Sequence, residues 1–469
     1  MRNRILCLAA ILLVCVIAFF ANWYIDATSE NTDQRIHQHL DAEAAKPCEH
    51  KKSDFCTHLP LVSIDTGGQT LKEERGQELI CQVKIYDKEG VNHHLTDKSD
   101  IKTTAAIHIR GASSRHFKKH SYRLEFRHKK KQQEKRDIAV MGMEADCDWI
   151  LNGPYLDRSL MRNYLMYNLS GEIMDWAPNV RYCEVFLNGD YQGVYLMLEN
   201  IKVDRNRLNL EEYNPKQAES SYLIERNRDD TTKDKIVTFA NQAGYNQGEV
   251  GVLYPRKRDM TEKTREWLKD DINEMEKLLY SLDYDEWDYG YTNFLDVDSF
   301  VDYVVINEFS LNLDAGSYST YAYKTLGGKL SMGPVWDFNN AFGMYDVNKQ
   351  EFFMQRKPWF VMLMKDEKFV KRVIGRYRAL RKSYLSEDYL MNYIDETRAY
   401  LGPAVKRNFA KWGYTVEAES VNDPRKDIDS YDKAVDQLKS FMKKRLRFMD
   451  DHIDVLQQYC HESMVKPFN

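Results

Sequence analysis

Two aspartates, Asp314 and Asp337, have the surroundings that most clearly allow chemistry. Asp314 comes just past the end of an apolar helical pattern, and Asp337 stands between Trp336 and Phe338, where an unpaired carboxylate would be costly to bury. Mg²⁺ binds one or two carboxylates together with phosphate oxygens, so Asp337 and Asn339 could supply adjacent oxygen ligands. The same acids could instead be structural, with Asp314 in a turn and Asp337 as a capping residue. Both interpretations stay open at this point.

Several common catalytic signatures are absent from the sequence. It contains no His-Glu-x-x-His, no G-x-S-x-G and neither of the phosphate-binding loops G-x-x-x-x-G-K-[S/T] and G-x-G-x-x-G. The formal net charge of -5 gives no electrostatic basis for nucleic-acid binding, which requires clustered Lys and Arg. We therefore expect no nucleic-acid partner, and the two carboxylates remain the main candidates for chemistry.

The N-terminus predicts export of the rest of the chain. Arg2 and Arg4 precede largely apolar residues 5–25, about the ~20 residues that span a bilayer, and positive charge before a span places the chain after it outside the cytoplasm. We predict a signal-anchor at 1–25 with an extracytoplasmic domain, or a secreted domain if the segment is cleaved. A polar stalk would come next, at 26–57. In an oxidising compartment a Cys48–Cys56 disulfide is locally plausible.

Short β-type runs and longer helical patterns divide the remaining chain. Apolar runs between turn residues predict strands over 61–64, 79–86, 104–109, 122–126, 182–187 and 193–198, the last two joined at Asn188-Gly189. Apolar spacings of three and four predict helices over 261–282, 366–383, 387–401 and 431–459, and two more that Asp157 and Asp298 would cap. We therefore predict an α+β fold, with a β-rich N-terminal lobe at 58–255 that meets a helical C-terminal lobe at 256–469 in a cleft.

Four ordered segments resemble the CotH family. They are Arg110-Gly111-Ala112-Ser113-Ser114 with Phe117, Lys119 and Tyr122-Arg123; Asp157 with Arg162-Asn163; Asn188-Gly189-Asp190-Tyr191-Gln192-Gly193-Val194-Tyr195 through to Glu199; and Trp336-Asp337-Phe338. They span about residues 60 to 385, which is most of the predicted exported chain. The shared order of the four segments carries the resemblance.

The resemblance implies an atypical protein-kinase fold that uses ATP with Mg²⁺ or Mn²⁺. It implies transfer of the γ-phosphate of ATP to Ser or Thr of exported or surface proteins. Phosphoryl transfer needs a cation at the phosphates, acids for the metal and an acid beside the acceptor hydroxyl. The alternative is a catalytically weak surface or adhesin-like scaffold on the same fold. Transfer of a nucleotide monophosphate would use the same metal site.

By the same resemblance, Asp337 and Asn339 would hold the metal, and Asp314 would orient or deprotonate the acceptor hydroxyl or share the metal. The implied nucleotide-binding set is Arg110, Gly111, Ser113, Lys119, Arg123 and Glu199. Lys119 is the expected phosphate-binding residue, and an exposed strand lysine is its alternative. Glu199 would face the nucleotide or pair with Lys119.

The chain departs from the family's pattern in three places. Asn339 stands where a second Asp is frequent, so one ligand has lost its charge, although an amide oxygen still binds Mg²⁺. His120 replaces a frequent second Lys after Lys119, and Ser319 and Thr320 stand after Asp314 where an Asn is common. These departures weaken the expectation of activity without removing it.

Overall fold

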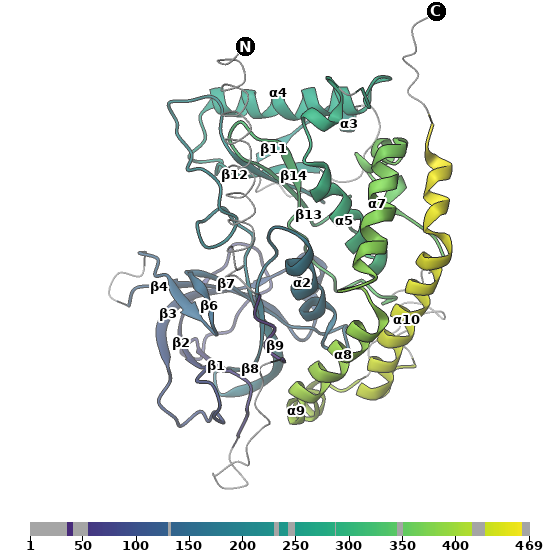
Figure 1. The fold of residues 1–469 in the computed structure, drawn as a ribbon. Helices are drawn as coiled ribbons and strands as arrows, with labels where there is room; N and C mark the ends of the chain where they lie inside the picture. The colour runs from purple at the N-terminus through teal and green to yellow at the C-terminus, as the bar shows by residue number, and fades with distance from the viewer. Residues whose placement is uncertain are drawn as a thin grey trace, which may run out of the picture. The chain divides into compact units, whose positions relative to one another are not determined.

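The computed structural model describes residues 35–40, 55–129, 133–228, 234–242, 249–286, 288–344, 350–414 and 427–461. All the helices and strands below belong to one compact unit that begins at Gln38. In Figure 1 the colour of these elements follows the chain, from purple near the N-terminus to yellow near the C-terminus.

A closed barrel forms the first half of this unit. Its strands follow one another around the barrel in the order β1 (Leu61–Asp65), β2 (Leu79–Tyr86), β3 (Ile101–Arg110), β4 (Ser121–Arg127), β7 (Asp148–Asn152), β9 (Asp190–Glu199) and β8 (Val180–Leu187). The β1–β8 pair is parallel and the other neighbours are antiparallel. Alternate residues such as Val83, Ile107, Leu124 and Met197 fill the barrel interior, as the two-residue period of a strand requires.

The β8–β9 hairpin was predicted from its turn and is confirmed. Asn188 and Gly189 both have positive φ, 51° and 81°, which is the backbone that a two-residue hairpin turn of this hand needs. The Asn188 side chain also accepts a hydrogen bond from the Thr66 amide at 2.8 Å. The turn is therefore tied to the end of β1.

Helix α2 (Arg162–Ile173) packs against the outside of the barrel. We expected Asp157 to cap it, but the N-cap position is Met161, which makes no side-chain capping hydrogen bond. One Asp157 carboxylate oxygen accepts from the Arg162 amide at 2.9 Å and the other from the Ser159 amide at 3.0 Å. The helix begins five residues later than Asp157. The intervening loop places the buried Asn163 and Tyr167 beside residues 336–339, where they become part of the site below.

A second sheet was not predicted. Its strands run in the order β11 (Asp234–Ile236), β12 (Glu249–Tyr254), β10 (Tyr222–Asn227), β13 (Thr320–Lys324) and β14 (Leu330–Met332). Strands from both sides of residue 255 therefore share one sheet, because β10 pairs with β13 through Tyr222–Lys324 to Arg226–Thr320. This pairing brings the segment after β10 close to the segment before β13.

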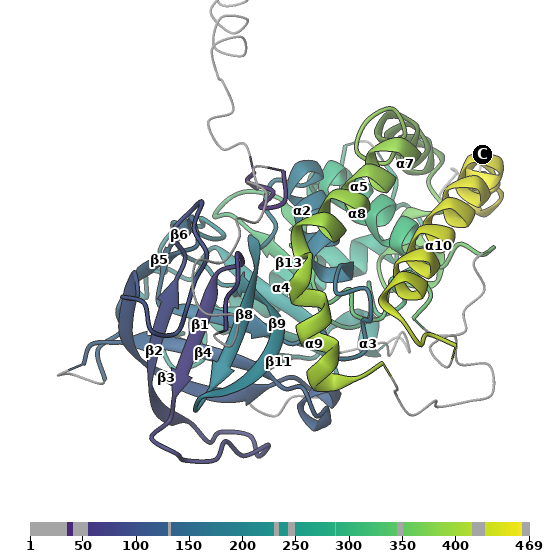
Figure 2. The same ribbon diagram turned by 90° about the horizontal axis from the view of Figure 1, so that it is seen from below.

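Helices dominate the chain after residue 260. They are α4 (Glu262–Leu279), α5 (Val297–Ser310), α6 (Phe360–Leu363), α7 (Glu367–Leu380), α8 (Glu387–Leu401), α9 (Pro403–Trp412) and α10 (Tyr431–His452). Side-chain oxygens cap α4, α7, α8 and α10, from Thr261, Asp366, Ser386 and Ser430 respectively. At α5 the N-cap position is Asp296, and Asp298, which we expected to cap it, lies in the first turn. Figure 2 shows α9 running beside β9 of the barrel.

The predicted fold needs correction. We expected a two-lobed arrangement preceded by a transmembrane helix, whereas the structure is a mixed α+β fold built on a closed seven-stranded barrel. Among the residues that the structure describes, none of the helices combines the length and apolarity that a bilayer crossing requires. The predicted span at 5–25 lies outside the described residues, as does most of the predicted stalk.

The cysteines in the described part of the chain differ in redox state. Cys56 is disulfide-bonded, whereas Cys81, Cys147, Cys183 and Cys460 are free thiols. Cys48, its expected partner, lies outside the described residues. A disulfide at this end of the domain is typical of proteins that fold in an oxidising compartment.

Candidate functional site

The turn that follows α5 presents Asp314. Leu311 ends the helix in the left-handed region, with φ of 50°. Three residues later the Asp314 carbonyl accepts from the amides of Ser317 at 3.1 Å and Tyr318 at 2.8 Å. The chain therefore makes a tight turn at Asp314, and its carboxylate is partly exposed.

The segment that carries Asp337 follows β14 and is held by α2. The Asp337 amide donates to the Tyr167 hydroxyl at 3.2 Å, and the Phe338 amide donates to the Asn163 side-chain oxygen at 2.9 Å. Asp337 itself has φ of 57°, a backbone that costs energy for any residue but Gly. Strain of this kind persists where the surroundings impose it and gathers at functional sites. Contacts from α2 impose it here.

The structure brings the two predicted acids into one electrostatic environment. Burial raises the pKa of the Asp337 carboxyl above its usual value, the charge of Asp314 raises it further, and the Arg110 guanidinium opposes both. The polar contacts of Asp314 are long, 3.5 Å from an Arg228 nitrogen and 3.3 Å from the Asn340 amide. Two carboxylates that share a site without a close cation favour either a proton or a metal ion between them.

Two asparagines near these acids, Asn339 and Asn312, differ in whether their side-chain oxygens are already hydrogen-bonded. Asn339 donates through Nδ2 to Asp337 at 2.5 Å, and its Oδ1 accepts from Asn163 at 2.8 Å. In this orientation its oxygen is already used, and only a flip of the amide would turn it toward a metal. Asn312 donates through Nδ2 to the Asp337 carbonyl at 3.4 Å, while its buried Oδ1 has no hydrogen-bond partner among the described residues.

This set of oxygens fits a divalent cation of the Mg²⁺ type. Asp314 and Asp337 would supply carboxylate oxygens, and Asn312 has a buried acceptor that lacks a hydrogen. Mg²⁺ takes oxygen ligands of these kinds and keeps several waters or phosphate oxygens. The residues present therefore fit the predicted metal, and the Asn312 oxygen has no hydrogen-bond partner among the described residues, whereas the Asn339 oxygen already accepts from Asn163.

The Arg110-Gly111 segment reaches this site from the barrel. Arg110 ends β3, its guanidinium carbon lies 5.5 Å from the centre of the Trp336 ring, and its charge acts on Asp337. Gly111 has φ of 113°, and a Cβ there would lie 2.0 Å from the Ser114 hydroxyl oxygen, so the turn requires glycine. Ser113 begins the short 3-10 helix η1 (Ser113–His116) that follows.

Lys119 is placed elsewhere. Its side chain is buried, and its ammonium donates to the Val194 carbonyl at 2.6 Å and to Asn408 of α9 at 2.8 Å. It also lies 4.9 Å from the centre of the Tyr195 ring. Burial lowers the pKa of Lys119 well below its usual value. Lys119 is therefore not the exposed strand lysine of the alternative interpretation, and its contacts join the barrel to α9 rather than to either acid.

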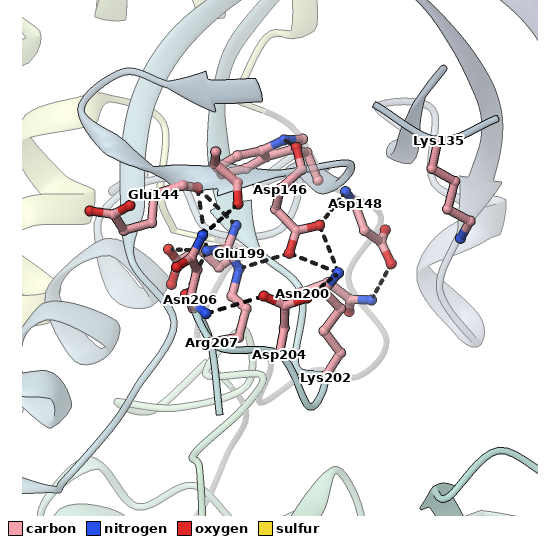
Figure 3. A network of polar contacts seen from close by, with 12 residues as sticks. Lys135, Glu144, Asp146, Asp148, Glu199, Asn200, Lys202, Asp204, Asn206 and Arg207 are labelled. Carbon is pink, nitrogen blue, oxygen red and sulfur yellow. Dashed lines mark hydrogen bonds and ion pairs between the residues drawn. The ribbon is translucent and has the colours of Figure 1, made fainter. Parts of the chain in front are cut away.

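Glu199 belongs to a network of polar contacts on the barrel wall (Figure 3), and Arg123 pairs with Asp148 of that network. Arg123 makes a two-pronged contact with Asp148, at 2.7 and 2.5 Å. Glu199 is fully buried and lies 3.0 Å from Arg207. It also accepts from the Asn179 amide at 2.9 Å. The expected pair between Glu199 and Lys119 does not form, because Glu199 lies against Arg207.

Sequence reasoning missed three polar residues at this site. Asn312 stands two positions before Asp314, and its helix-ending context was the available signal. Arg228 arrives through the β10–β13 pairing, and Lys357 donates to the Leu313 carbonyl at 2.5 Å from a segment far along the chain. Neither Arg228 nor Lys357 has a local pattern that points to Asp314.

The chain is an α+β protein in which two aspartates, one on a strained backbone, share a site beside an arginine from a barrel strand. The family model described as CotH kinase protein matches residues 107–449. That interval covers most of the chain and includes Arg110, Asp314 and Asp337.

The chain therefore belongs to the CotH family, and the resemblance seen in the motifs is confirmed. It is also similar to the Inner spore coat protein H of Bacillus subtilis (strain 168). The two are 24% identical over 359 residues, which cover 75% of this chain and 87% of that protein.

Proposed function

We propose that this protein is a metal-dependent phosphotransferase that moves the γ-phosphate of ATP to Ser or Thr hydroxyls of a protein substrate. The observation that carries the proposal is that the segments of Asp314 and Asp337 meet. Asn340 donates to the Asp314 carboxylate at 3.3 Å, and Asn312 donates to the Asp337 carbonyl at 3.4 Å. The charge of Asp314 also raises the pKa of Asp337. The matching family's description as a kinase protein supports the proposal. The buried Oδ1 of Asn312, which has no hydrogen-bond partner among the described residues, offers a further acceptor.

The roles of the residues follow from their exposure and contacts. Asp337 is held rigidly by α2 and, with Asn312, would bind the divalent cation that neutralises phosphate charge during transfer. Asp314 lies on a partly exposed turn, where a substrate hydroxyl could approach it and be oriented or deprotonated. Arg110 is the cation from the barrel that could face a phosphate. Asn339 would add an amide oxygen only after a flip of its side chain.

One observation favours the scaffold alternative. Lys119, the expected phosphate-binding lysine, is already engaged by Val194 and Asn408. A catalytically weak binding protein on the same fold would tolerate that arrangement. Phosphoryl transfer needs a cation at the phosphates. Because Lys119 is already engaged, Arg110 is the residue whose substitution tests the phosphotransferase proposal.

We also propose that the protein acts outside the cytoplasm. The disulfide at Cys56 supports this location, and a similar protein is described as an inner spore coat protein. A protein of that compartment would be the natural substrate class. We do not propose a membrane anchor.

The deciding experiment is incubation of the purified protein with γ-labelled and, separately, α-labelled ATP in the presence of Mg²⁺ or Mn²⁺. We expect label on protein from the γ position alone, and its loss in Asp337→Ala and in Arg110→Met. Transfer from the α position would mean nucleotidyl transfer. Transfer from neither position, with intact folding, would contradict the proposal and favour the scaffold.

A further inference from the structure

Lys357 packs along the turn that presents Asp314. Its ammonium donates to the Leu313 carbonyl at 2.5 Å and to the Ser317 hydroxyl at 3.2 Å. Its aliphatic stem lies on Gly316, where an added Cβ would come within 2.7 Å of the Lys357 Cβ. Gly316 also has φ of 80°. One side chain therefore contacts the turn on both sides of Asp314.

The segment that carries Lys357 is itself fixed to the core. Lys357 directly follows the short helix η3 (Met354–Arg356). The Phe353 and Met354 amides donate to one oxygen of the buried Glu308 of α5, at 2.9 and 2.7 Å. The other oxygen of Glu308 lies 2.8 Å from Arg445 of α10. A chain of contacts thus runs from α10 through Glu308 and η3 to Lys357.

The charge of Lys357 also faces the site. Burial lowers the pKa of Lys357 to about 8, and the carboxylates of Asp314 and Glu308 oppose that shift. Glu308 is committed to Arg445 and to the η3 amides. Asp314, whose own polar contacts are long, is the carboxylate that Lys357 can still influence.

We propose that Lys357 is a positioning residue for phosphoryl transfer, which holds the turn 313–318 so that the Asp314 carboxylate meets the acceptor hydroxyl. This inference rests on the proposed function. Lys357 would not touch the nucleotide, so its loss should lower kcat and leave the KM for ATP nearly unchanged. Misplacing a catalytic group by about 1 Å can cost about 100-fold in rate.

The conservative variant separates positioning from simple packing. Lys357→Met keeps a long apolar stem over Gly316 but cannot donate to Leu313 or Ser317. Lys357→Arg keeps both donors and the charge, although its planar fork differs in geometry from an ammonium. We expect kcat to fall about 100-fold in the Met variant and to return to within about tenfold of wild type in the Arg variant.

Arg356→Met is the matched control. Arg356 is the neighbouring cation and the last residue of η3, it is 65% exposed, and its ion pair with Glu351 is long at 3.4 Å. We expect the kcat, KM for ATP and melting temperature of Arg356→Met to match wild type. A loss of kcat in this control equal to that of Lys357→Met would overturn the proposal, because the effect would then not depend on the contacts that Lys357 makes with the turn.

The test measures kcat and the KM for ATP and for a protein substrate in all four proteins, with melting temperatures to confirm folding. A Met variant within about twofold of wild type in kcat would overturn the inference. So would an Arg variant no better than Met. A rise in the KM for ATP with unchanged kcat would assign Lys357 to nucleotide binding and also overturn it.

A second measurement distinguishes failure of the proposed function from failure of this inference. The Ser317 and Tyr318 amides donate to the Asp314 carbonyl, so their hydrogen exchange reports on the turn. If wild type transfers no phosphate, the proposed function fails. Faster exchange at these amides in Lys357→Met, but not in Arg356→Met, would still support the positioning contact. Equal exchange would overturn it.

Discussion

The carboxylates of the barrel wall and those of the Asp314–Asp337 site differ in how closely cations approach them. In the barrel network of Figure 3, Glu199 lies 3.0 Å from Arg207 and Asp146 lies 2.8 Å from Lys202. At the site, the contacts of Asp314 are 3.3 Å or longer, and the charge of Asp314 raises the pKa of Asp337. Glu199 and Asp146 thus have close cations, whereas Asp314 has only long polar contacts and its charge acts on the buried Asp337.

That difference separates structural charges from candidate functional ones. A buried ion pair with short contacts has little capacity left for a ligand, since its charges are already compensated. A buried acid such as Asp337, whose pKa is raised by burial and by a neighbouring negative charge, is typical of a functional site. Lys119, Arg123 and Glu199, which the motifs nominated for nucleotide binding, have compensated charges or filled hydrogen bonds. Their roles in nucleotide binding remain predictions.

The largest effect should come from Asp337→Asn. We expect phosphate transfer to fall about 1000-fold or more, equivalent to about 4 kcal/mol of transition-state stabilisation. The melting temperature should stay equal or rise, because the change removes a buried charge that Asp314 repels. Transfer from γ-labelled ATP and thermal unfolding measure the two quantities. A variant that lost both activity and stability would show Asp337 to be structural.

Arg207→Met should have the opposite signature. The change leaves the buried Glu199 without its cation, and breaking such a pair costs about 3–5 kcal/mol. Transfer by the protein that remains folded should be normal. Urea unfolding gives the free energy of unfolding. Lys135→Met is the control, because its pair with Glu125 is partly exposed and such pairs contribute about 0–1 kcal/mol.

Divalent metal should stabilise the protein by binding at the Asp314–Asp337 site and not in the barrel network. At a Mn²⁺ concentration of about 100 times Kd, wild type should gain about 2.7 kcal/mol in its free energy of unfolding. Asp337→Asn and Asn312→Leu should gain much less, since both remove oxygens from the site. Asp148→Asn, in the barrel network, should gain as much as wild type. Thermal unfolding with and without Mn²⁺ makes the comparison, and equal gains in all four proteins would place the ion elsewhere.

The smallest expected effect is that the stability contributions of Asp148 and Asp337 change with pH in opposite directions. Burial alone would raise the pKa of Asp148, but its hydrogen bonds and charge pairing with Arg123 outweigh burial and lower it. Asp148 therefore contributes stability that is present above the usual carboxyl pKa of about 3.9 and is lost as pH falls through its folded pKa.

Asp337 should act in the other direction. Its folded pKa is raised, so between its unfolded and folded pKa values the native state binds more protons and stability falls as pH rises. Asp148→Asn should flatten the acid side of the stability curve, and Asp337→Asn should remove a decline above about pH 4. Urea unfolding at a series of pH values tests both. If both substitutions changed the pH dependence of the free energy of unfolding in the same direction, the contrast between the two regions would be wrong.

Much of the local structure could be predicted from sequence because its causes are local. The strand at 79–86, the Asn188-Gly189 turn and the start of the helix at 261 each depend on residues within a few positions of one another. The Trp336-Asp337-Phe338 segment was likewise singled out because a carboxylate between two aromatic residues is costly to bury. Alternation, turn chemistry and capping are short-range effects, and the structure agrees with them.

The sequence by itself thus determined several barrel strands, most of the later helices, the family and the two acids on which the proposed chemistry depends. Only the tertiary structure decided that the strands close into a barrel, that β10 pairs with β13, and that Lys119 contacts α9 while Lys357 contacts the Asp314 turn. Those arrangements join residues far apart in the chain. Which distant surfaces meet is set by the packing of the whole core, and no window of neighbouring residues contains that information.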